Sequence, residues 1–152
     1  MREDFCGTAA VSKLWVQEAL ARGERACGCA VDLNPAVVEA ATAAGLVPGL
    51  TMRCCDAIAA ADTDPADVIW VGNFSIGYIF SAKALAAYLR ACHARLTAKG
   101  KTGGIIACDI YGGASAFRLG SLLRRHTAPG GEIVHYCWTH EAADPLTGMV
   151  EN

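Results

Sequence analysis

The sequence lacks the patterns that mark proteins bound to membranes or nucleic acids. Its longest apolar stretch, VIWVGNFSIGYIF, is interrupted by Gly, Asn and Ser and has no charged flanks, so no transmembrane helix is predicted. The N-terminus has no signal-peptide pattern. The formal net charge is only −2, so there is no electrostatic footprint for nucleic acid or an anionic membrane. We therefore expect a cytoplasmic protein that binds neither.

Cysteine is abundant but lacks the spacing of a zinc site or a disulfide framework. The eight cysteines include one C-x-C pair, Cys27 and Cys29, and one adjacent pair, Cys54 and Cys55. No C-x-x-C occurs. Most of these residues lie in apolar runs, where a free thiol behaves as a small buried hydrophobe. The sequence predicts reduced core thiols and no metal.

Apolar runs alternate with helical segments along the whole chain, which at 152 residues is long enough for a single domain, 1–152. Strands are predicted at 26–33, 50–57, 67–74, 103–111 and 132–140. Helices are predicted at 8–22, at 35–44 after the N-cap Asn34, at 81–99 before Gly100, and at 114–126. The class is α/β, a Rossmann-like doubly wound sheet that is mostly parallel. The turn ADPLTG should lead from the strand at 132–140 into one further strand, and this closing pair predicts an antiparallel hairpin at one edge.

Acidic residues follow the predicted strands, and ligands of such sheets bind outside the carboxyl ends of the strands. Asp32, 25 residues after Gly7, is placed to accept hydrogen bonds from both hydroxyls of a ribose. Asp56, after the next strand, can accept one from an adenine amino group. The first loop has the single glycine Gly7, whereas a dinucleotide would require G-x-G-x-x-G. The pattern favours a nucleoside ligand without phosphates.

Four strings, EDFCGTA, VDLNP, CCDA and VIWVGNFSIGY, resemble successive motifs of the class I S-adenosylmethionine-dependent methyltransferases. NFSIGY, YGG and ADPLTG also resemble strings in an uncharacterised bacterial subgroup of that family. The resemblance covers nearly the whole chain. It implies methyl transfer from S-adenosylmethionine to a small-molecule or protein acceptor. Ala9 departs from the pattern, because a second glycine is common at that position.

The resemblance also implies where the cofactor binds. Loop 6–8 would surround the methionyl part, while Asp32 would hold the ribose and Asp56 the adenine. The expected cofactor-binding residues are Asp4, Cys6, Gly7, Thr8, Asp32, Leu33, Asp56, Ala57, Asn73 and Phe74.

Three residues after the fourth and fifth strands are the predicted catalytic residues. Asn73 could orient a polar acceptor, and Asp109 or Tyr111 could accept a proton or bound the acceptor pocket. Amino-methylating branches of the family often carry Asn/Asp-Pro-Pro-Tyr/Phe at Asn73. The string NFSI lacks both prolines, so the acceptor atom is not assigned.

Two other functions are compatible with the sequence. In an α/β-hydrolase, Ser75 would be the nucleophile, with Asp109 and either His135 or His140 downstream. That elbow needs G-x-S-x-G, and Asn73 occupies its first glycine position. Outside this hypothesis His140 is expected at the surface. The other alternative is a nucleoside-binding fold without activity.

The chain begins abruptly for such a fold. The first strand is reduced to REDF, which is short and polar where a buried parallel strand should be apolar, and the C-terminus stops soon after ADPLTG. We expect a chain truncated at both ends, with the first strand largely missing from the centre of the sheet. The two resulting open edges predict aggregation or self-association.

Overall fold

The computed structural model describes residues 1–59, 64–97 and 103–152. These residues form two compact units, Met1–Ile110 and Tyr111–Asn152. The helix stop expected at Gly100 lies outside the described residues. No helix within the described ranges is long and apolar enough to cross a membrane.

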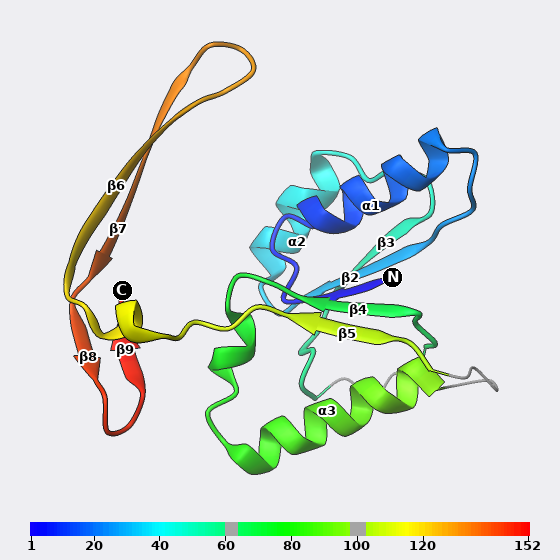
Figure 1. Cartoon of the computed structure of the whole chain (residues 1–152). Coiled ribbons are helices and arrows are strands. Elements are labelled where there is room, and N and C mark those ends of the chain that lie inside the picture. Colours follow the sequence, from blue (N-terminus) through cyan, green and yellow to red (C-terminus); the bar gives the residue numbers. More distant parts are fainter. Residues whose placement is uncertain (60–63, 98–102) are drawn as a thin grey trace. The chain divides into compact units, whose positions relative to one another are not determined.

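The first unit is built on a five-stranded parallel sheet (Figure 1). Its strands lie in the order β3 (Leu50–Cys54), β2 (Gly28–Asp32), β1 (Arg2–Asp4), β4 (Val68–Val71) and β5 (Ile105–Cys108). The chain runs outward from β1 to β3 and then returns to the other side of β1 with β4, so the strand order reverses between β1 and β4. This confirms the predicted doubly wound arrangement.

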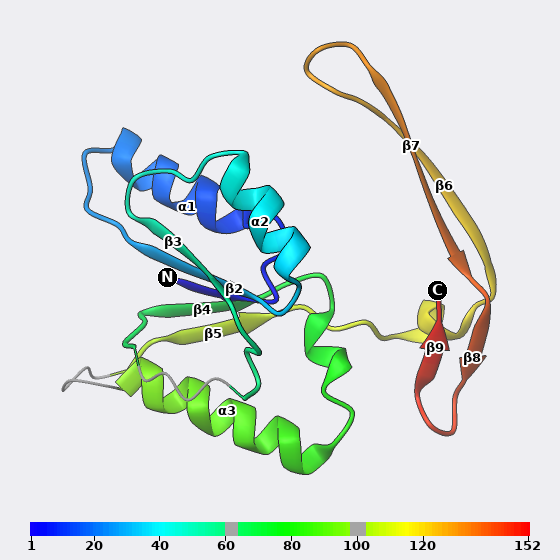
Figure 2. The same ribbon diagram turned by 180° about the vertical axis from the view of Figure 1, so that it is seen from behind.

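Helices cover both faces of this sheet, as Figure 1 and the reverse view in Figure 2 show. Helices α1 (Ala10–Ala21) and α2 (Pro35–Ala43) lie on one face, and α3 (Ala82–Thr97) lies on the other. Helix α2 begins as predicted, with a proline in its first turn and the Asn34 side chain accepting a hydrogen bond from the Ala36 N–H at 3.0 Å. That bond satisfies one of the donors that a helix start leaves unpaired.

Two apolar clusters form the core of the first unit. One includes side chains of β4 and α3: Ala66, Ile69, Val71, Ile76, Ile79, Tyr88, Cys92 and Leu96. The other joins the loop before α1 to β2 and β3: Cys6, Ala9, Ala30 and Leu50.

The prediction of core cysteines holds only in part. Cys6 and Cys92 are buried, whereas four cysteines of the chain are exposed: Cys27, Cys54, Cys108 and Cys137. The apolar runs in which these four lie are at sheet edges or strand ends rather than in the centre. No group of three or more His, Cys, Asp or Glu side chains in the described ranges could hold a metal ion.

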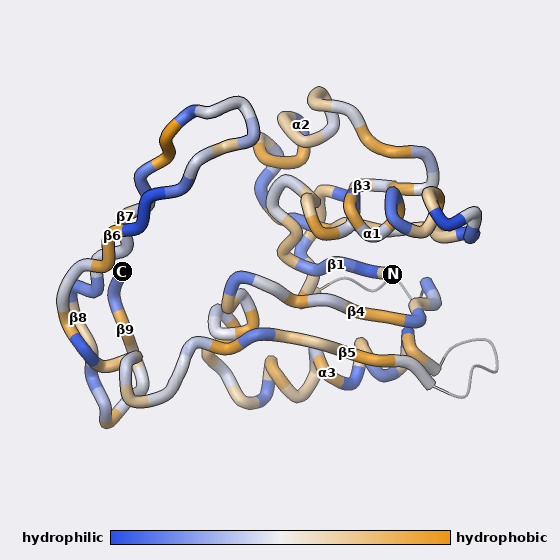
Figure 3. The backbone as a smooth tube through the Cα atoms, turned by 45° about the horizontal axis from the view of Figure 1, so that its top comes forward, coloured by the Kyte–Doolittle hydropathy of each residue, from blue (hydrophilic) through white to orange (hydrophobic). Residues whose placement is uncertain are grey.

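The central strand β1 consists entirely of charged residues. Arg2, Glu3 and Asp4 are 2%, 5% and 0% exposed, because β2 and β4 pair with β1 on its two sides and helices cover both faces. Figure 3 shows β1 as a hydrophilic segment of the sheet. The two open edges expected in the sheet are therefore filled. Sequence reasoning erred because backbone pairing does not require apolar side chains.

Hydrogen bonds compensate the charges of β1 on both faces of the sheet. On one face, Asp4 accepts hydrogen bonds from Arg2 Nε and from the Tyr88 hydroxyl of α3, each at 2.7 Å. On the other face, Glu3 accepts from the N–H and the hydroxyl of Ser12 in α1, at 2.9 and 2.5 Å. Burial and the neighbouring Asp4 raise the pKa of Tyr88 far above its ordinary value, so its hydroxyl remains a donor. Without such partners, these buried charges would each cost several kcal/mol.

The second unit consists of two antiparallel hairpins and a short 3-10 helix. Strand β6 (Gly120–Thr127) pairs with β7 (Ile133–His140), and β8 (Ala142–Asp144) pairs with β9 (Met149–Glu151). The 3-10 helix, η3 (Ala114–Phe117), precedes β6. The expected antiparallel pairing is present after the last parallel strand, but the hairpins form two-stranded sheets of their own in the described part of the chain.

The helix predicted over 114–126 is wrong. Only Ala114–Phe117 is helical, and β6 occupies Gly120–Thr127. Gly120 has a φ of +131°, which a continuous helix cannot include. The leucines and arginines that follow have good helix propensity, but propensity is a weak prior. An eight-residue ladder with the β-branched and aromatic residues of β7 overrides it.

A turn is present at ADPLTG as predicted, but it joins β8 to β9, because the strand predicted at 132–140 pairs with β6 instead. Asp144 organises it by accepting hydrogen bonds from the Thr147 hydroxyl at 2.7 Å and from the Leu146 N–H at 2.9 Å. An aspartate that binds the backbone two residues ahead is a common turn former.

Tyr88→Phe should destabilise the first unit by about 1.5–3 kcal/mol, because the buried Asp4 carboxylate loses one of its donors. Urea denaturation followed by circular dichroism measures the change in the free energy of unfolding. Tyr78→Phe is the matched control: Tyr78 is 70% exposed, so losing its hydroxyl should change that free energy by less than about 0.5 kcal/mol. Equal effects of the two substitutions would show that the hydrogen bond to Asp4 adds no stability.

Glu3→Gln should remove a loss of stability that occurs as the pH rises. Burial raises the pKa of Glu3 above its ordinary value of 4.5, although the hydrogen bonds from Ser12 oppose this. A carboxyl group with a raised folded-state pKa stabilises the fold fully below its unfolded-state pKa, and this contribution is lost as the pH rises through the folded-state pKa. Urea denaturation at several pH values between about 4 and 7 measures the free energy of unfolding of both proteins. As the pH rises, this free energy should increase for Glu3→Gln relative to the wild type. Glu39→Gln, at an exposed site, is the control, and its free energy of unfolding should differ from that of the wild type by the same amount at every pH. A difference that is also independent of pH in Glu3→Gln would show that the pKa of Glu3 is not raised in the folded state.

Candidate functional site

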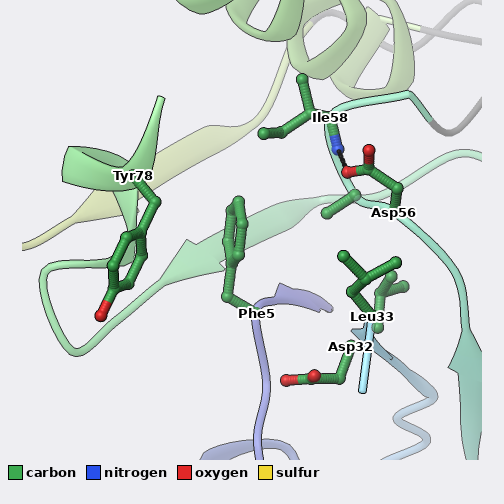
Figure 4. Close-up of a pocket in the computed structure, with 8 residues that line it drawn as sticks. Phe5, Asp32, Leu33, Asp56, Ile58 and Tyr78 are labelled. Atoms are coloured by element: carbon green, nitrogen blue, oxygen red, sulfur yellow. Dashed lines mark hydrogen bonds between the residues drawn. The ribbon is translucent and has the colours of Figure 1, made fainter. Parts of the chain in front are cut away.

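A cavity of about 290 Å³ lies at the carboxyl ends of β1, β2 and β3, close to the lower end of the ~300–1,000 Å³ range of small-molecule pockets. Its lining is mostly apolar with two carboxylates: Phe5, Val31, Asp32, Leu33, Asp56, Ala57, Ile58 and Tyr78. Figure 4 shows the two aromatic rings on one side and the two aspartates on the other. The cavity adjoins β1, where the strand order reverses, which is where such sheets bind ligands.

The Asp32 carboxylate lies at the end of β2 and holds the loop that follows β1. One oxygen accepts a hydrogen bond from the Gly7 N–H at 2.8 Å, and the other accepts one from the Asn34 N–H at 2.9 Å. An ionised carboxylate has about four lone-pair positions, so about two remain for a ligand. Asp32 can therefore orient the loop and bind a ligand at the same time.

Asp56 follows β3 and is held by a local turn. Its Oδ1 accepts a hydrogen bond from the Ile58 N–H at 2.8 Å, the dashed line in Figure 4. Leu33, which also lines the cavity, is 67% exposed. An exposed leucine beside two carboxylates can pack against the face of a planar aromatic ligand whose edge carries hydrogen-bond donors.

In the loop after β1, the ring of Phe5 lines the cavity, whereas the side chains of Cys6 and Thr8 do not. Cys6 is buried in the core cluster beside α1, and burial together with nearby carboxylates raises its pKa to about 12. Its thiol is therefore a protonated packing group at neutral pH. The Asp4 carboxylate lies in the core, and Thr8 is exposed. The predicted cofactor residues whose side chains line the cavity are Asp32, Leu33, Asp56 and Ala57.

Residues with left-handed backbone occur in the loops after β1 and after β4, the two strands between which the strand order reverses. Phe5, Gly7 and Ala9 have φ angles of 58°, 53° and 56°, and Asn73 and Phe74 after β4 have 56° and 59°. This conformation costs roughly 1–2 kcal/mol for a residue other than glycine, and such residues cluster at functional sites. Ala9 thus adopts the conformation that a glycine would favour, and its methyl group packs in the core cluster beside α1.

Asp109 holds the loop after β4 much as Asp32 holds the loop after β1. Its Oδ1 accepts a hydrogen bond from the Phe74 N–H at 2.7 Å. Asn73 and Phe74 are both exposed at this point. The structure thus brings together Asn73, Phe74 and Asp109, three of the predicted site residues, at the ends of β4 and β5.

Tyr111, the third predicted catalytic residue, belongs to the second unit. Its ring meets His140 edge-on with centroids 5.7 Å apart, and it lies 6.2 Å from the Trp138 ring. His140 is 5% exposed, and its Nδ1 lies 2.9 Å from the Arg118 carbonyl oxygen. The expectation of a surface histidine was wrong, because it took no account of the packing of Tyr111.

Sequence reasoning missed the aromatic side of the cavity, which Phe5 and Tyr78 form (Figure 4). Tyr78 ends the 3-10 helix η1 (Ser75–Tyr78), which follows β4. The signal was present, since Phe5 directly precedes Cys6 and Gly7 in the first loop and Tyr78 ends the string NFSIGY. Aromatic residues just after strands of such a sheet are candidate stacking groups.

Ser75 does not have the geometry of a nucleophile elbow. An elbow places the serine itself in the strained turn with its hydroxyl exposed. Here the left-handed residues are Asn73 and Phe74, and Ser75 is 6% exposed. This geometry disfavours the esterase hypothesis.

Several solved methyltransferases have a fold similar to that of this chain. An S-adenosylmethionine-dependent methyltransferase from Clostridium acetobutylicum is 25% identical, with 94% of this chain and 54% of that chain covered and a TM-score of 0.62. The chain has the fold of the S-adenosylmethionine-dependent methyltransferases. An amino pentose methyltransferase from Micromonospora echinaspora is 17% identical, with 94% and 56% covered and a TM-score of 0.66. A sugar N-methyltransferase from Streptoalloteichus is 18% identical, with 90% and 62% covered and a TM-score of 0.62.

The chain spans between 54% and 62% of the length of these three structures. No family model matches the sequence, and no curated protein matches it. The similarity is therefore one of fold, which by itself assigns no role to any residue.

Proposed function

We propose that this chain binds S-adenosylmethionine and takes part in methyl transfer to an acceptor. The observation that carries the proposal is that Asp32 and Asp56 line one cavity at the ends of neighbouring strands in a methyltransferase fold. The first loop offers a single glycine, so the site suits a nucleoside better than the pyrophosphate of a dinucleotide.

The lining of the cavity fits the adenosine part of this cofactor. The remaining acceptor positions of Asp32 suit the two ribose hydroxyls. Asp56 can accept a hydrogen bond from the adenine amino group, while Leu33 and Ile58 offer apolar surface to the ring. The methionyl part would then extend toward loop 6–8, whose Gly7 N–H is fixed by Asp32.

Most of what the chain must do in such a reaction is positioning. S-adenosylmethionine, when bound, supplies a methyl group already activated by its sulfonium, so alignment of the acceptor provides most of the acceleration. Asp32 fixes the first loop, and Asp109 fixes the Phe74 backbone after β4. Asn73, exposed beside Phe74, would orient a polar acceptor through its side-chain amide.

The acceptor is proposed to be a small molecule or a protein, with a nitrogen atom as the first choice. Among the solved structures of this fold, one is a sugar N-methyltransferase, one a glycopeptide N-methyltransferase and one an amino pentose methyltransferase. Asp109 and Tyr111 remain the proposed groups that accept a proton or bound the acceptor pocket. One oxygen of Asp109 already accepts the Phe74 N–H, which leaves its other oxygen for this role.

Asp32→Asn should weaken S-adenosylmethionine binding by about 10- to 150-fold, because hydrogen bonds to a charged group contribute about 1.5–3 kcal/mol. Isothermal titration calorimetry measures the dissociation constant. Glu39→Gln, on the exposed side of α2, removes the same charge and should bind like the wild type.

The same titrations test the class of cofactor. S-adenosylhomocysteine should bind the wild type, and NAD should bind far more weakly, because the loop lacks the glycines that a pyrophosphate requires. Tightest binding of NAD, or an unchanged affinity in Asp32→Asn, would refute the proposal.

Adenosine should bind the wild type about 5- to 30-fold more tightly than inosine, a difference of about 1–2 kcal/mol. The reason is that Asp56 can accept from the 6-amino group, which inosine replaces with an oxygen. Asp56→Asn keeps an oxygen for the Ile58 N–H and gains a donor, so it should shift the preference toward inosine by at least about tenfold. Asp64→Asn, at an exposed acid that pairs with Arg53, is the control. An unchanged preference in Asp56→Asn would show that adenine is recognised elsewhere.

A further inference from the structure

The β6–β7 hairpin of the second unit is long and has little cover. Each of the two strands has eight residues. Both strands carry large apolar side chains that are exposed: Leu122, Leu123, Ile133, Val134 and Tyr136. An isolated two-stranded hairpin is at best marginally stable in water, and either further strands or packing against a helix are needed for independent stability. No third strand pairs with it among the residues that the structure describes. Within the described ranges, the hairpin therefore has two open edges.

The turn of the hairpin determines which backbone groups face outward. The Ala128 N–H donates to the Glu132 carbonyl oxygen at 2.8 Å, so these two residues form a hydrogen-bonded pair. Hydrogen-bonded and non-hydrogen-bonded pairs alternate along an antiparallel ladder. Leu123 and Cys137, which are directly opposite, are therefore a non-hydrogen-bonded pair. The backbone groups of the odd-numbered residues point away from the hairpin: Ser121, Leu123, Arg125 and Thr127 on β6, and Ile133, His135, Cys137 and Thr139 on β7.

We propose that the outer edge of β7 pairs antiparallel with β7 of a second copy of this chain, giving a four-stranded sheet across a two-fold axis. One register uses all four outward-facing residues of β7. It places Ile133 opposite Thr139 of the second copy, and His135 opposite Cys137 of the second copy. The axis then passes at Tyr136, so the two Tyr136 rings face each other as a cross-strand aromatic pair, which is favourable.

The same pairing through β6 is opposed by charge. The register that uses all four outward-facing residues of β6 places the axis at Arg124, so two guanidinium groups would lie directly opposite each other. Arg125 adds a second positive charge, and charged residues are what protect sheet edges from pairing. Pairing β6 with β7 of another copy would be head-to-tail and would not close by two-fold symmetry.

The composition of β7 also favours its edge. From Ile133 to His140 it contains no lysine, arginine, aspartate or glutamate. It is rich in β-branched and aromatic residues, which suit a paired strand. Of the two edges, that of β7 is therefore the one without protection.

A matched pair of proline substitutions tests the edge. Leu123 and Cys137 face each other across the ladder, so proline at either position removes one outward N–H and spares the bonds within the hairpin. Sedimentation equilibrium of the full chain should show a wild-type dimer. Cys137→Pro should raise the dimer dissociation constant at least about tenfold, because each dimer loses two hydrogen bonds. Leu123→Pro should change the dimer dissociation constant by less than about twofold relative to the wild type.

Engineered cross-linking gives a second measurement that does not rely on loss of assembly. Tyr136→Cys and Arg124→Cys are each made in a Cys137→Ser background. Oxidation should link two Tyr136→Cys chains through position 136, because opposite Cβ atoms lie about 4.5–5.5 Å apart in such pairs. Arg124→Cys should not cross-link through position 124. Peptide mapping by mass spectrometry identifies the bond, since other cysteines are exposed.

Three outcomes would overturn the proposal. They are a wild-type chain that stays monomeric, equal effects of the two proline substitutions, and cross-linking through position 124 in place of position 136. Circular dichroism of both proline variants shows whether each retains its fold, and a dimer that survives Cys137→Pro in folded protein would also count against the β7 edge.

Discussion

The first unit depends on the hydrogen bonds that allow a short charged strand to occupy the centre of its sheet. Strand β1 joins β2 to β4, so the two halves of the sheet meet through three residues. Asp4 binds Tyr88 of α3, and Glu3 binds Ser12 of α1, so the same strand attaches a helix to each face. A buried ion pair gains less than an apolar core of the same volume, because both charges must be desolvated. What these bonds provide is a defined position for each helix.

The place of β1 also decides where the cavity forms. Because the strand order reverses between β1 and β4, the loops that follow these strands turn to opposite faces and leave space between them. A carboxylate from the neighbouring outer strand holds each loop: Asp32 accepts the Gly7 N–H, and Asp109 accepts the Phe74 N–H. The strained backbone of both loops is thus stabilised at the edge where the ligand is proposed to bind.

Sequence reasoning succeeded where the signal was local and failed where it was not. Helix α2 was predicted because Asn34 and the proline after it act within one turn. Strand β1 was judged too polar because its compensation comes from Tyr88, 84 residues beyond Asp4. The helix expected at 114–126 gave way to β6 because an eight-residue ladder with β7 outweighs the propensity of a few leucines and arginines.

The sequence by itself determined the alternation of strands and helices in the first unit and the places of Asp32 and Asp56. Both follow from patterns within a few residues and from the rule that the carboxyl ends of parallel strands share one edge. Only the tertiary structure decided that Phe5 and Tyr78 form the opposite wall of the cavity and that Asp109 supports the loop after β4. These contacts join residues far apart in the chain, and their energy depends on burial and on hydrogen-bond partners that become defined only when the sheet assembles.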